Sequence, residues 1–271
     1  MQFPVGGHDV YAYTGSRPFG GARPAVVFVH GAGNDHSVWA LQSRYFAHHG
    51  WNVLAVDLPG HGKSGGVALP SVESIADWIQ ALLDAAGIAR AALVGHSLGS
   101  LATLECAARF PERVEKLALL GPAAPMPVSE ALQDAAKRDD NVACELITGW
   151  SYSAGKQLGG NQVPGMWLTG NALRLLERAK PGVLHADLVA CDRYGAGVAN
   201  AAAVRCPSLV ILGARDIMAP PKNARNLIDA LPDAKVVTIP DCGHALMAEQ
   251  PDVVLDALRA FLQRLPSPAS T

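Results

Sequence analysis

The segment Gly95-His96-Ser97-Leu98-Gly99 constrains this chain more than any other feature. It lies between a continuous apolar run, Ala91 to Val94, and a stretch whose composition favours a helix, Leu101 to Arg109. A Gly-x-Ser-x-Gly turn between a strand and a helix forces the serine into a strained backbone conformation and lifts its hydroxyl out of the sheet. The outer positions are glycine because a Cβ there would collide with a neighbouring strand or helix. The segment therefore predicts a serine hydroxyl held at the end of a strand.

The rest of the chain alternates between apolar runs and amphipathic segments. Continuous runs without polar alternation indicate strands that are covered on both faces, as in a parallel sheet. A well-marked helix over residues 71–86 and a weak strand or hairpin over residues 8–16 complete the pattern. We therefore expect an α/β fold with a doubly wound, mostly parallel sheet. The strand runs lie at residues 25–29, 52–57, 91–94, 114–120, 209–213 and 235–239.

The pattern changes between residues 123 and 203. This segment has no comparable β-branched run, and its helical patches (130–138, 143–147 and 172–178) are separated by loops that contain Gly and Pro. We expect an inserted helical cap over one end of the sheet, with residues 1–122 and 204–271 forming the core. The tail, residues 266–271, is expected to be disordered.

Composition limits the classes of partner and compartment. The net charge of −2 gives no electrostatic reason to expect nucleic acid or an anionic membrane as a partner. No apolar stretch is long enough to span a membrane, and the first residues do not resemble a signal peptide. Five scattered cysteines are typical of free thiols in a reducing compartment. A cytoplasmic location is therefore expected, and the oligomeric state is left open.

Polar side chains follow several of the predicted strands, where ligands bind in open α/β sheets. A serine hydroxyl is a poor nucleophile unless a base takes its proton, and the base needs a carboxylate to fix its tautomer. Ser97, Asp216 and His244 each follow a strand and occur in this order along the chain. Asp241 competes with Asp216 because it is nearer to His244 in sequence, although an Asp after a strand commonly caps its own loop.

The chain resembles the α/β-hydrolase superfamily over residues 25–122 and 206–264, where a Gly-x-Ser-x-Gly turn and the order Ser, Asp, His recur. The resemblance implies that Ser97 is the nucleophile, His244 the base and Asp216 the carboxylate. Its motifs are His30-Gly31-Ala32-Gly33, Asp57-Leu58-Pro59-Gly60-His61-Gly62-Lys63-Ser64, Gly95-His96-Ser97-Leu98-Gly99, Gly213-Ala214-Arg215-Asp216 and Gly243-His244.

The resemblance also implies an oxyanion hole made by the backbone N–H groups of Leu98 and Ala32. His96, beside the nucleophile, and Trp150, Met166 and Trp167, in the insertion, are candidate pocket residues. The three insertion residues are equally consistent with packing inside the insertion's own small core. No metal and no organic cofactor is implied.

These features predict a serine hydrolase that cleaves a carboxylic ester or a similar small acyl substrate through an acyl-enzyme. Relatives use the same three side chains for other reactions, so carbon–carbon bond hydrolysis, opening of an enol-lactone and peracid formation stay open. A different class also stays open, because some relatives keep the three residues and serve as small-molecule receptors.

Overall fold

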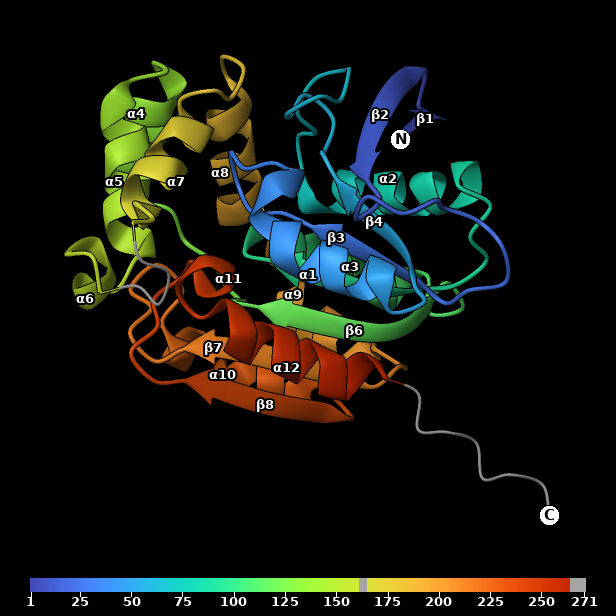
Figure 1. The fold of residues 1–271 in the computed structure, drawn as a ribbon. Coiled ribbons are helices and arrows are strands. Elements are labelled where there is room, and N and C mark those ends of the chain that lie inside the picture. Colours follow the sequence, from blue (N-terminus) through green and yellow to red (C-terminus); the bar gives the residue numbers. More distant parts are fainter. Residues whose placement is uncertain (161–164, 264–271) are drawn as a thin grey trace.

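The computed structural model describes residues 1–160 and 165–263, and the predicted disordered tail lies outside them. One eight-stranded sheet runs through the molecule in the order β1-β2-β4-β3-β5-β6-β7-β8 (Figure 1). The strands are β1 (Gln2–Val5), β2 (His8–Tyr13), β3 (Ala25–Val29), β4 (Asn52–Val56), β5 (Ala91–His96), β6 (Val114–Leu120), β7 (Ser208–Gly213) and β8 (Ala234–Ile239).

The sheet is parallel from β4 to β8, and the hairpin β1–β2 adds an antiparallel edge. This confirms the predicted doubly wound, mostly parallel sheet. Every residue of β3, β4, β5 and β7 is buried, as expected for strands covered on both faces. β3 pairs with β4 on one side and β5 on the other, so the chain changes direction there, and the loops after β3 and β5 lie at a switch point where such sheets bind ligands.

Helices cover both faces of the sheet (Figure 1). One face packs against the short 3-10 helix η1 (His36–Trp39), α1 (Ala40–His48) and α12 (Pro251–Leu262), around Trp39, Phe46 and Leu258. The other face packs against four helices that contribute Ile79, Leu101, Ala201 and Leu227 to a larger apolar cluster. These helices are α2 (Val72–Ala85), α3 (Leu98–Arg109), α9 (Gly197–Ala203) and α10 (Pro221–Ala230).

Most of the inserted segment, residues 123–203, lies beyond the carboxyl ends of the parallel strands (Figure 1). Its apolar cluster, which includes Leu132, Ile147 and Leu188, is separate from the two clusters on the sheet, whereas α9 packs against α3 and α10. Its other helices are α4 (Glu130–Lys137), α5 (Asn141–Ser151), α6 (Ala154–Gln157), α7 (Leu168–Leu176) and α8 (Val183–Arg193).

The sequence pattern indicates α4, α5 and α7 but not α8. The buried face of α8 contains Asp187 among Leu184, Leu188 and Cys191, and a buried aspartate interrupts the apolar periodicity by which a helix is predicted. Within the described residues, no helix is both long and apolar enough to cross a membrane.

Candidate active site

Ser97 occupies the sharp turn between β5 and α3. Its backbone angles, φ 53° and ψ −119°, lie in a region that residues other than glycine rarely adopt. The turn is tight because a Cβ on Gly95 would overlap the backbone of Gly99, and a Cβ on Gly99 would overlap the carbonyl oxygens of Val29 and His30. The two flanking glycines are therefore required for the close approach of β5, α3 and β3 at this point.

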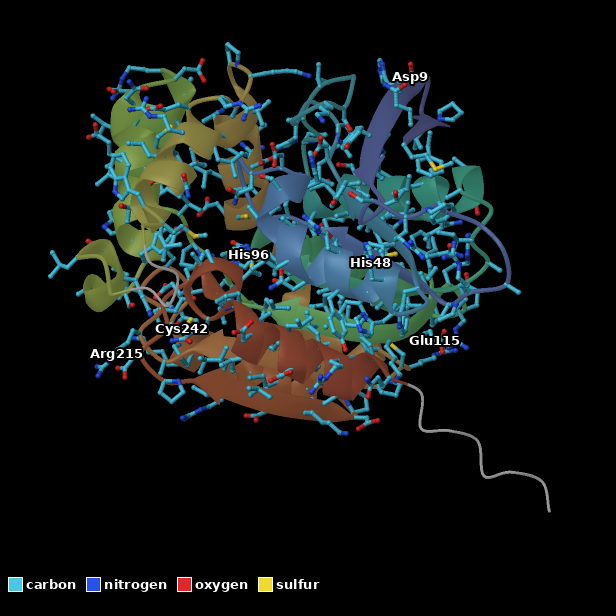
Figure 2. The ribbon with its side chains drawn as sticks, in the orientation of Figure 1. Asp9, His48, His96, Glu115, Arg215 and Cys242 are labelled. Carbon is cyan, nitrogen blue, oxygen red and sulfur yellow. The ribbon has the colours of Figure 1, made fainter. Side chains whose placement is uncertain are left out.

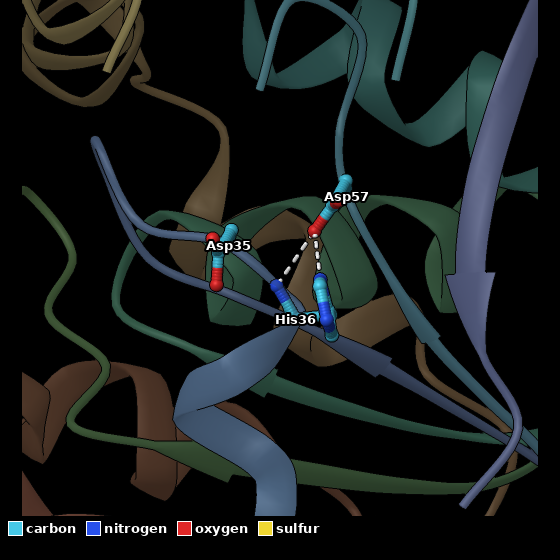
Figure 3. Close-up of side chains that lie close together, drawn as sticks. All are labelled: Asp35, His36 and Asp57. Carbon is cyan, nitrogen blue, oxygen red and sulfur yellow. Dashed lines mark hydrogen bonds and ion pairs between the residues drawn. The ribbon is translucent and has the colours of Figure 1, made fainter. Parts of the chain in front are cut away.

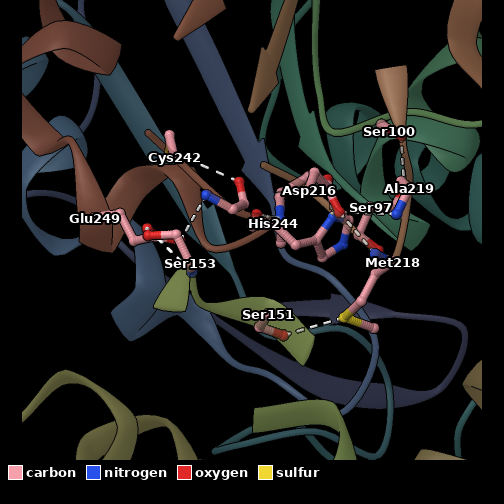
Figure 4. Close-up of polar contacts among 12 residues, drawn as sticks. Ser97, Ser100, Ser151, Ser153, Asp216, Met218, Ala219, Cys242, His244 and Glu249 are labelled. Atoms are coloured by element: carbon pink, nitrogen blue, oxygen red, sulfur yellow. Dashed lines mark hydrogen bonds and ion pairs between the residues drawn. The ribbon is translucent and has the colours of Figure 1, made fainter. Parts of the chain in front are cut away.

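Asp216 and His244 come together from the loops after β7 and β8 (Figure 4). His244 Nδ1 lies 2.7 Å from Asp216 Oδ2. Asp216 Oδ1 accepts hydrogen bonds from the backbone N–H groups of Met218 (2.9 Å) and Ala219 (2.8 Å). Burial raises the pKa of Asp216, but the charge and hydrogen bond of His244 and the two N–H groups outweigh it, so the pKa lies below its ordinary value. The carboxylate thus stays ionised and holds the ring through Nδ1. Nε2 is then the ring nitrogen that can act as the base.

Asp241, the competing candidate, does not take this place. Its side chain is 83% exposed and lies 3.5 Å from the guanidinium of Arg215, whose side chain is at the edge of the molecule (Figure 2). Asp241 also has a positive φ of 51°, a conformation that aspartate tolerates in turns. The geometry therefore pairs His244 with Asp216.

Ser97 and His244 line the same cavity, which has a volume of about 740 Å³. Figure 4 draws Ser97 and His244 in one close-up with Asp216, whose carboxylate contacts Nδ1 of the imidazole. Within the described residues, no hydrogen bond joins Ser97 Oγ to the ring. Such contacts are often long without substrate and shorten when substrate binds.

The two predicted oxyanion residues both lie close to Ser97. Leu98 is the first residue of α3, so its N–H has no partner within the helix and lies at the positive end of the helix dipole. Ala32 lines the cavity from the loop after β3. This loop closely approaches the serine, because a Cβ on Gly31 would lie 3.1 Å from Ser97 Cβ.

His96 is buried beside Ser97 and lines the cavity. Its Nε2 donates a hydrogen bond to the backbone oxygen of His244 over 2.9 Å, while Nδ1 is buried without a partner among the described residues. Burial and the nearby charge of His244 lower the pKa of His96 to about 3. His96 is therefore a neutral ring that supports the His244 loop.

The remaining predicted pocket residues divide into two groups. Trp150 lines the cavity. Met166 and Trp167 are 41% and 68% exposed and are not among the described residues around the cavity; the Trp167 ring instead lies over Gly170. We therefore do not assign these two to the pocket.

Sequence reasoning missed several residues around the cavity. Thr148, on α5, has a buried hydroxyl without a partner among the described residues. Arg174, on α7, and Arg178, just after this helix, contribute basic groups. The helical periodicity of α5 and α7 places such residues on a helix, but it does not indicate which helix face adjoins the sheet.

Asp57, at the end of β4, joins two turns (Figure 3). Its Oδ1 accepts hydrogen bonds from the backbone N–H of His36 and from the His36 ring, both at 2.7 Å, and its Oδ2 accepts one from Lys63 N–H at 2.8 Å. Asp35, His36 and Asp57 are close enough to share a metal ion, but Asp35 accepts a hydrogen bond from Ser37 N–H at the start of η1. Hydrogen bonds within the protein therefore explain why Asp35, His36 and Asp57 lie together.

A further buried carboxylate links the His244 loop to the inserted segment. Glu249, the last residue of α11 (Leu246–Glu249), accepts hydrogen bonds from Gly243 N–H (2.9 Å) and from the Ser153 hydroxyl (2.6 Å) (Figure 4). Burial raises the pKa of Glu249, although these hydrogen bonds oppose the rise. The position of His244 is therefore tied to the residue that precedes α6.

Comparison with known proteins agrees with this architecture. Residues 24–251 match the family described as the alpha/beta hydrolase fold. The chain is 32% identical over 258 residues to a pimeloyl-[acyl-carrier protein] methyl ester esterase from Chromobacterium violaceum, covering 92% of this chain and 97% of the relative. It is 28% identical over 257 residues to a 2-hydroxy-6-oxo-6-phenylhexa-2,4-dienoate hydrolase from Burkholderia cepacia, covering 86% and 85% of the two chains.

Among solved structures, the enol-lactonase from Burkholderia xenovorans LB400 superposes with a TM-score of 0.86 at 24% identity, covering 97% of this chain and all of that one. The likeness extends over the inserted segment as well as the sheet. The family match over most of the chain, together with the strand order and the elbow at Ser97, shows that this protein belongs to the α/β-hydrolase family.

Proposed function

We propose that this protein is a serine hydrolase that cleaves a carboxylic ester or a similar small acyl substrate through an acyl-enzyme intermediate. One observation carries the proposal. The hydrogen-bonded pair Asp216–His244 lies beside the strained Ser97, at the wall of a cavity large enough for a small molecule.

The mechanism follows from the chemistry of these groups. Ser97 Oγ attacks the substrate carbonyl carbon while Nε2 of His244 takes the hydroxyl proton, and the carbonyl oxygen becomes an oxyanion. The N–H groups of Ala32 and Leu98 stabilise this oxyanion. The carbon–oxygen bond to the alcohol then breaks as His244 returns the proton to the leaving oxygen. Water attacks the acyl-enzyme by the same route and releases the acid and Ser97.

Asp216 stabilises the positive charge that His244 carries while it holds the proton in each step. Its carboxylate is held ionised by Met218 and Ala219 and orients the ring through Nδ1. The inserted segment, residues 123–203, acts in this proposal as a cap, because α5 and α7 contribute Thr148, Trp150 and Leu175 to the cavity wall.

The test is hydrolysis of p-nitrophenyl acetate and butyrate by the wild type and by Ser97→Ala. We expect turnover by the wild type, loss of turnover in the variant, and labelling of the wild type by a fluorophosphonate that the variant does not show. Absence of both turnover and labelling in the wild type contradicts the proposal and favours a small-molecule receptor.

A second candidate is hydrolysis of a carbon–carbon bond in a dienone-type diketone. It is favoured by the 28% identical relative that is named as a dienoate hydrolase. A substrate panel that pairs p-nitrophenyl esters of increasing acyl length with such diketones separates the two candidates, because the preferred class has the higher kcat/KM.

A further inference from the structure

Asp187 lies on α8 in the inserted segment, but its carboxylate reaches the loop that carries Ala32. Oδ2 accepts a hydrogen bond from the backbone N–H of Gly33 and lies near Nε2 of His61, each at 2.8 Å. The Asp187 side chain is 1% exposed. A buried carboxylate with two strong donors is a rigid contact, because losing either donor leaves charge unsatisfied in the interior.

The contacts of His61 favour its positively charged form. Its Nε2 faces Asp187, and its Nδ1 faces the backbone oxygen of Pro59 at 3.0 Å. Both ring nitrogens therefore meet acceptors, and only an imidazolium donates from both. Burial lowers the pKa of His61, but the charge and hydrogen bond of Asp187 outweigh the effect of burial, so the pKa lies above its ordinary value. Asp187 and His61 thus form a buried ion pair.

The neighbouring ring of His30 is neutral for a complementary reason. Its Nε2 accepts a hydrogen bond from Leu58 N–H over 3.1 Å, and its Nδ1 donates to the Gly31 backbone oxygen over 2.8 Å. Burial and the nearby charge of His61 lower the pKa of His30 to about 4. His30 therefore holds the Gly31 carbonyl from one side.

These contacts hold both peptide planes that meet at Ala32. The Gly31 oxygen and the Ala32 N–H belong to one planar peptide unit, in which the two groups point in opposite directions. The bond from His30 therefore fixes the direction of the Ala32 N–H. The next peptide unit carries the Gly33 N–H, which Asp187 holds. A rotation about Ala32 has to break one of these bonds.

The inserted segment also packs directly on this loop. Gly33 has φ +66°, and a Cβ there would lie 3.0 Å from the side chains of Leu176 and Leu184, on α7 and α8. The loop after β3 therefore has the sheet on one side and the inserted helices on the other. Asp187 makes a polar contact across this boundary.

We propose that Asp187 is a positioning residue, through which α8 holds the Ala32–Gly33 peptide unit and, together with the bond from His30 to the preceding unit, keeps the Ala32 N–H directed at the oxyanion. The inference rests on the proposed function, since it assigns Asp187 to the oxyanion step of that mechanism. It predicts that the inserted segment contributes to the rate of the chemical step as well as to substrate binding.

The test compares Asp187→Ala and Asp187→Asn with Asp192→Asn. Asp192 is a matched control because it lies on the same helix and accepts a hydrogen bond from a backbone N–H, that of Val128, at 2.9 Å, away from the loop after β3. Each variant is assayed with p-nitrophenyl butyrate for kcat and KM, and for inhibition by a phenylboronic acid, which forms a tetrahedral adduct with a nucleophilic serine. Folding at the assay temperature is checked by circular dichroism.

We expect Asp187→Ala to lower kcat by on the order of 10- to 100-fold, with KM changed less than about threefold and a parallel loss of boronic acid affinity. Asp187→Asn keeps an oxygen for Gly33, so it should recover part of the loss. If Asp187→Ala does not fold, Asp187→Asn carries the same comparison. Asp192→Asn should match the wild type.

Two results overturn the inference while leaving the proposed function intact. One is that the folded Asp187 variants keep the kcat and boronic acid affinity of Asp192→Asn. The other is a change confined to KM, which would place Asp187 in substrate binding. Failure of the proposed function is recognised separately, because the wild type would then show no turnover that depends on Ser97.

Discussion

The imidazole of His96 packs against that of His244, with 4.8 Å between the ring centroids, and its Nε2–H donates to the His244 backbone oxygen over 2.9 Å. The residue before Ser97 thus holds the loop that carries His244. His96→Phe keeps a ring of similar size but leaves the His244 oxygen without this donor. We expect the free energy of unfolding to fall by about 1–3 kcal/mol and kcat for the ester to decrease, measured by urea unfolding and steady-state kinetics. Unchanged values for both would show that the contact is incidental.

Ser97→Ala should abolish ester turnover with little change in stability. Loss of a serine nucleophile in a comparable triad costs on the order of 10⁶-fold in kcat, whereas the strained turn itself is retained. Ser71→Ala is the complementary control. The Ser71 hydroxyl caps α2, so its removal should cost about 1 kcal/mol in urea unfolding and leave kcat unchanged. Turnover by Ser97→Ala near the wild-type rate would refute the mechanism.

Asp216→Asn and Asp241→Asn separate the two candidate carboxylates. Asp216 is buried against His244, and an amide there does not hold the imidazole in the required tautomer, so kcat should fall on the order of 10⁴-fold. Asp241 is exposed and faces Arg215, and its replacement should change kcat less than about twofold. The kcat of each variant with p-nitrophenyl butyrate decides the assignment, and the opposite ranking would reassign the carboxylate.

Stability should decrease as the pH falls below 6.5. The pKa of His30 is lowered to about 4 and that of His96 to about 3. Over this window the unfolded chain binds protons that the native state does not, so unfolding becomes more favourable as the pH decreases. Each histidine contributes a slope of up to about 1.4 kcal/mol per pH unit. Urea unfolding from pH 7 to pH 4.5 measures the slope, and His30→Gln should reduce it. A constant free energy of unfolding would contradict this prediction.

His61 should act in the opposite direction above pH 6.5. Its pKa in the folded state is raised, so its contribution is fully present below the unfolded pKa and is lost as the pH rises through the folded one. Asp187→Asn should remove this alkaline loss, because the charge that raises the pKa of His61 is gone. Urea unfolding between pH 6.5 and 9 tests the difference, and identical pH dependence in the two proteins would argue against the ion pair.

The elements that can be predicted from the sequence are those in which every side chain has the same environment. β3, β4, β5 and β7 are continuous apolar runs because both of their faces are buried. The turn at Ser97 can also be predicted from the sequence, because local contacts require its two glycines. The places of Asp216 and His244 after strands are visible in the chain, although the hydrogen bond between them depends on the assembled sheet.

The inserted segment is less predictable because its contacts are distant. The bond between Gly33 and Asp187 joins residues 154 positions apart. The buried aspartate also interrupts the apolar pattern by which α8 would be predicted. Met166 and Trp167 illustrate the same limit. An apolar or aromatic residue in a loop-rich segment does not indicate which way its side chain points, and these two side chains are exposed and do not line the cavity.

The hydrogen bonds of Glu249 to Gly243 and Ser153 limit how residues 123–203 can be exchanged between relatives to alter the substrate range. A chimera that receives residues 123–203 from a relative without a hydroxyl at position 153 would leave a buried carboxylate with fewer donors, next to the loop of the proposed base. Such grafts should work best when position 249 is exchanged together with the donor segment, so that new selectivity is gained without displacing His244.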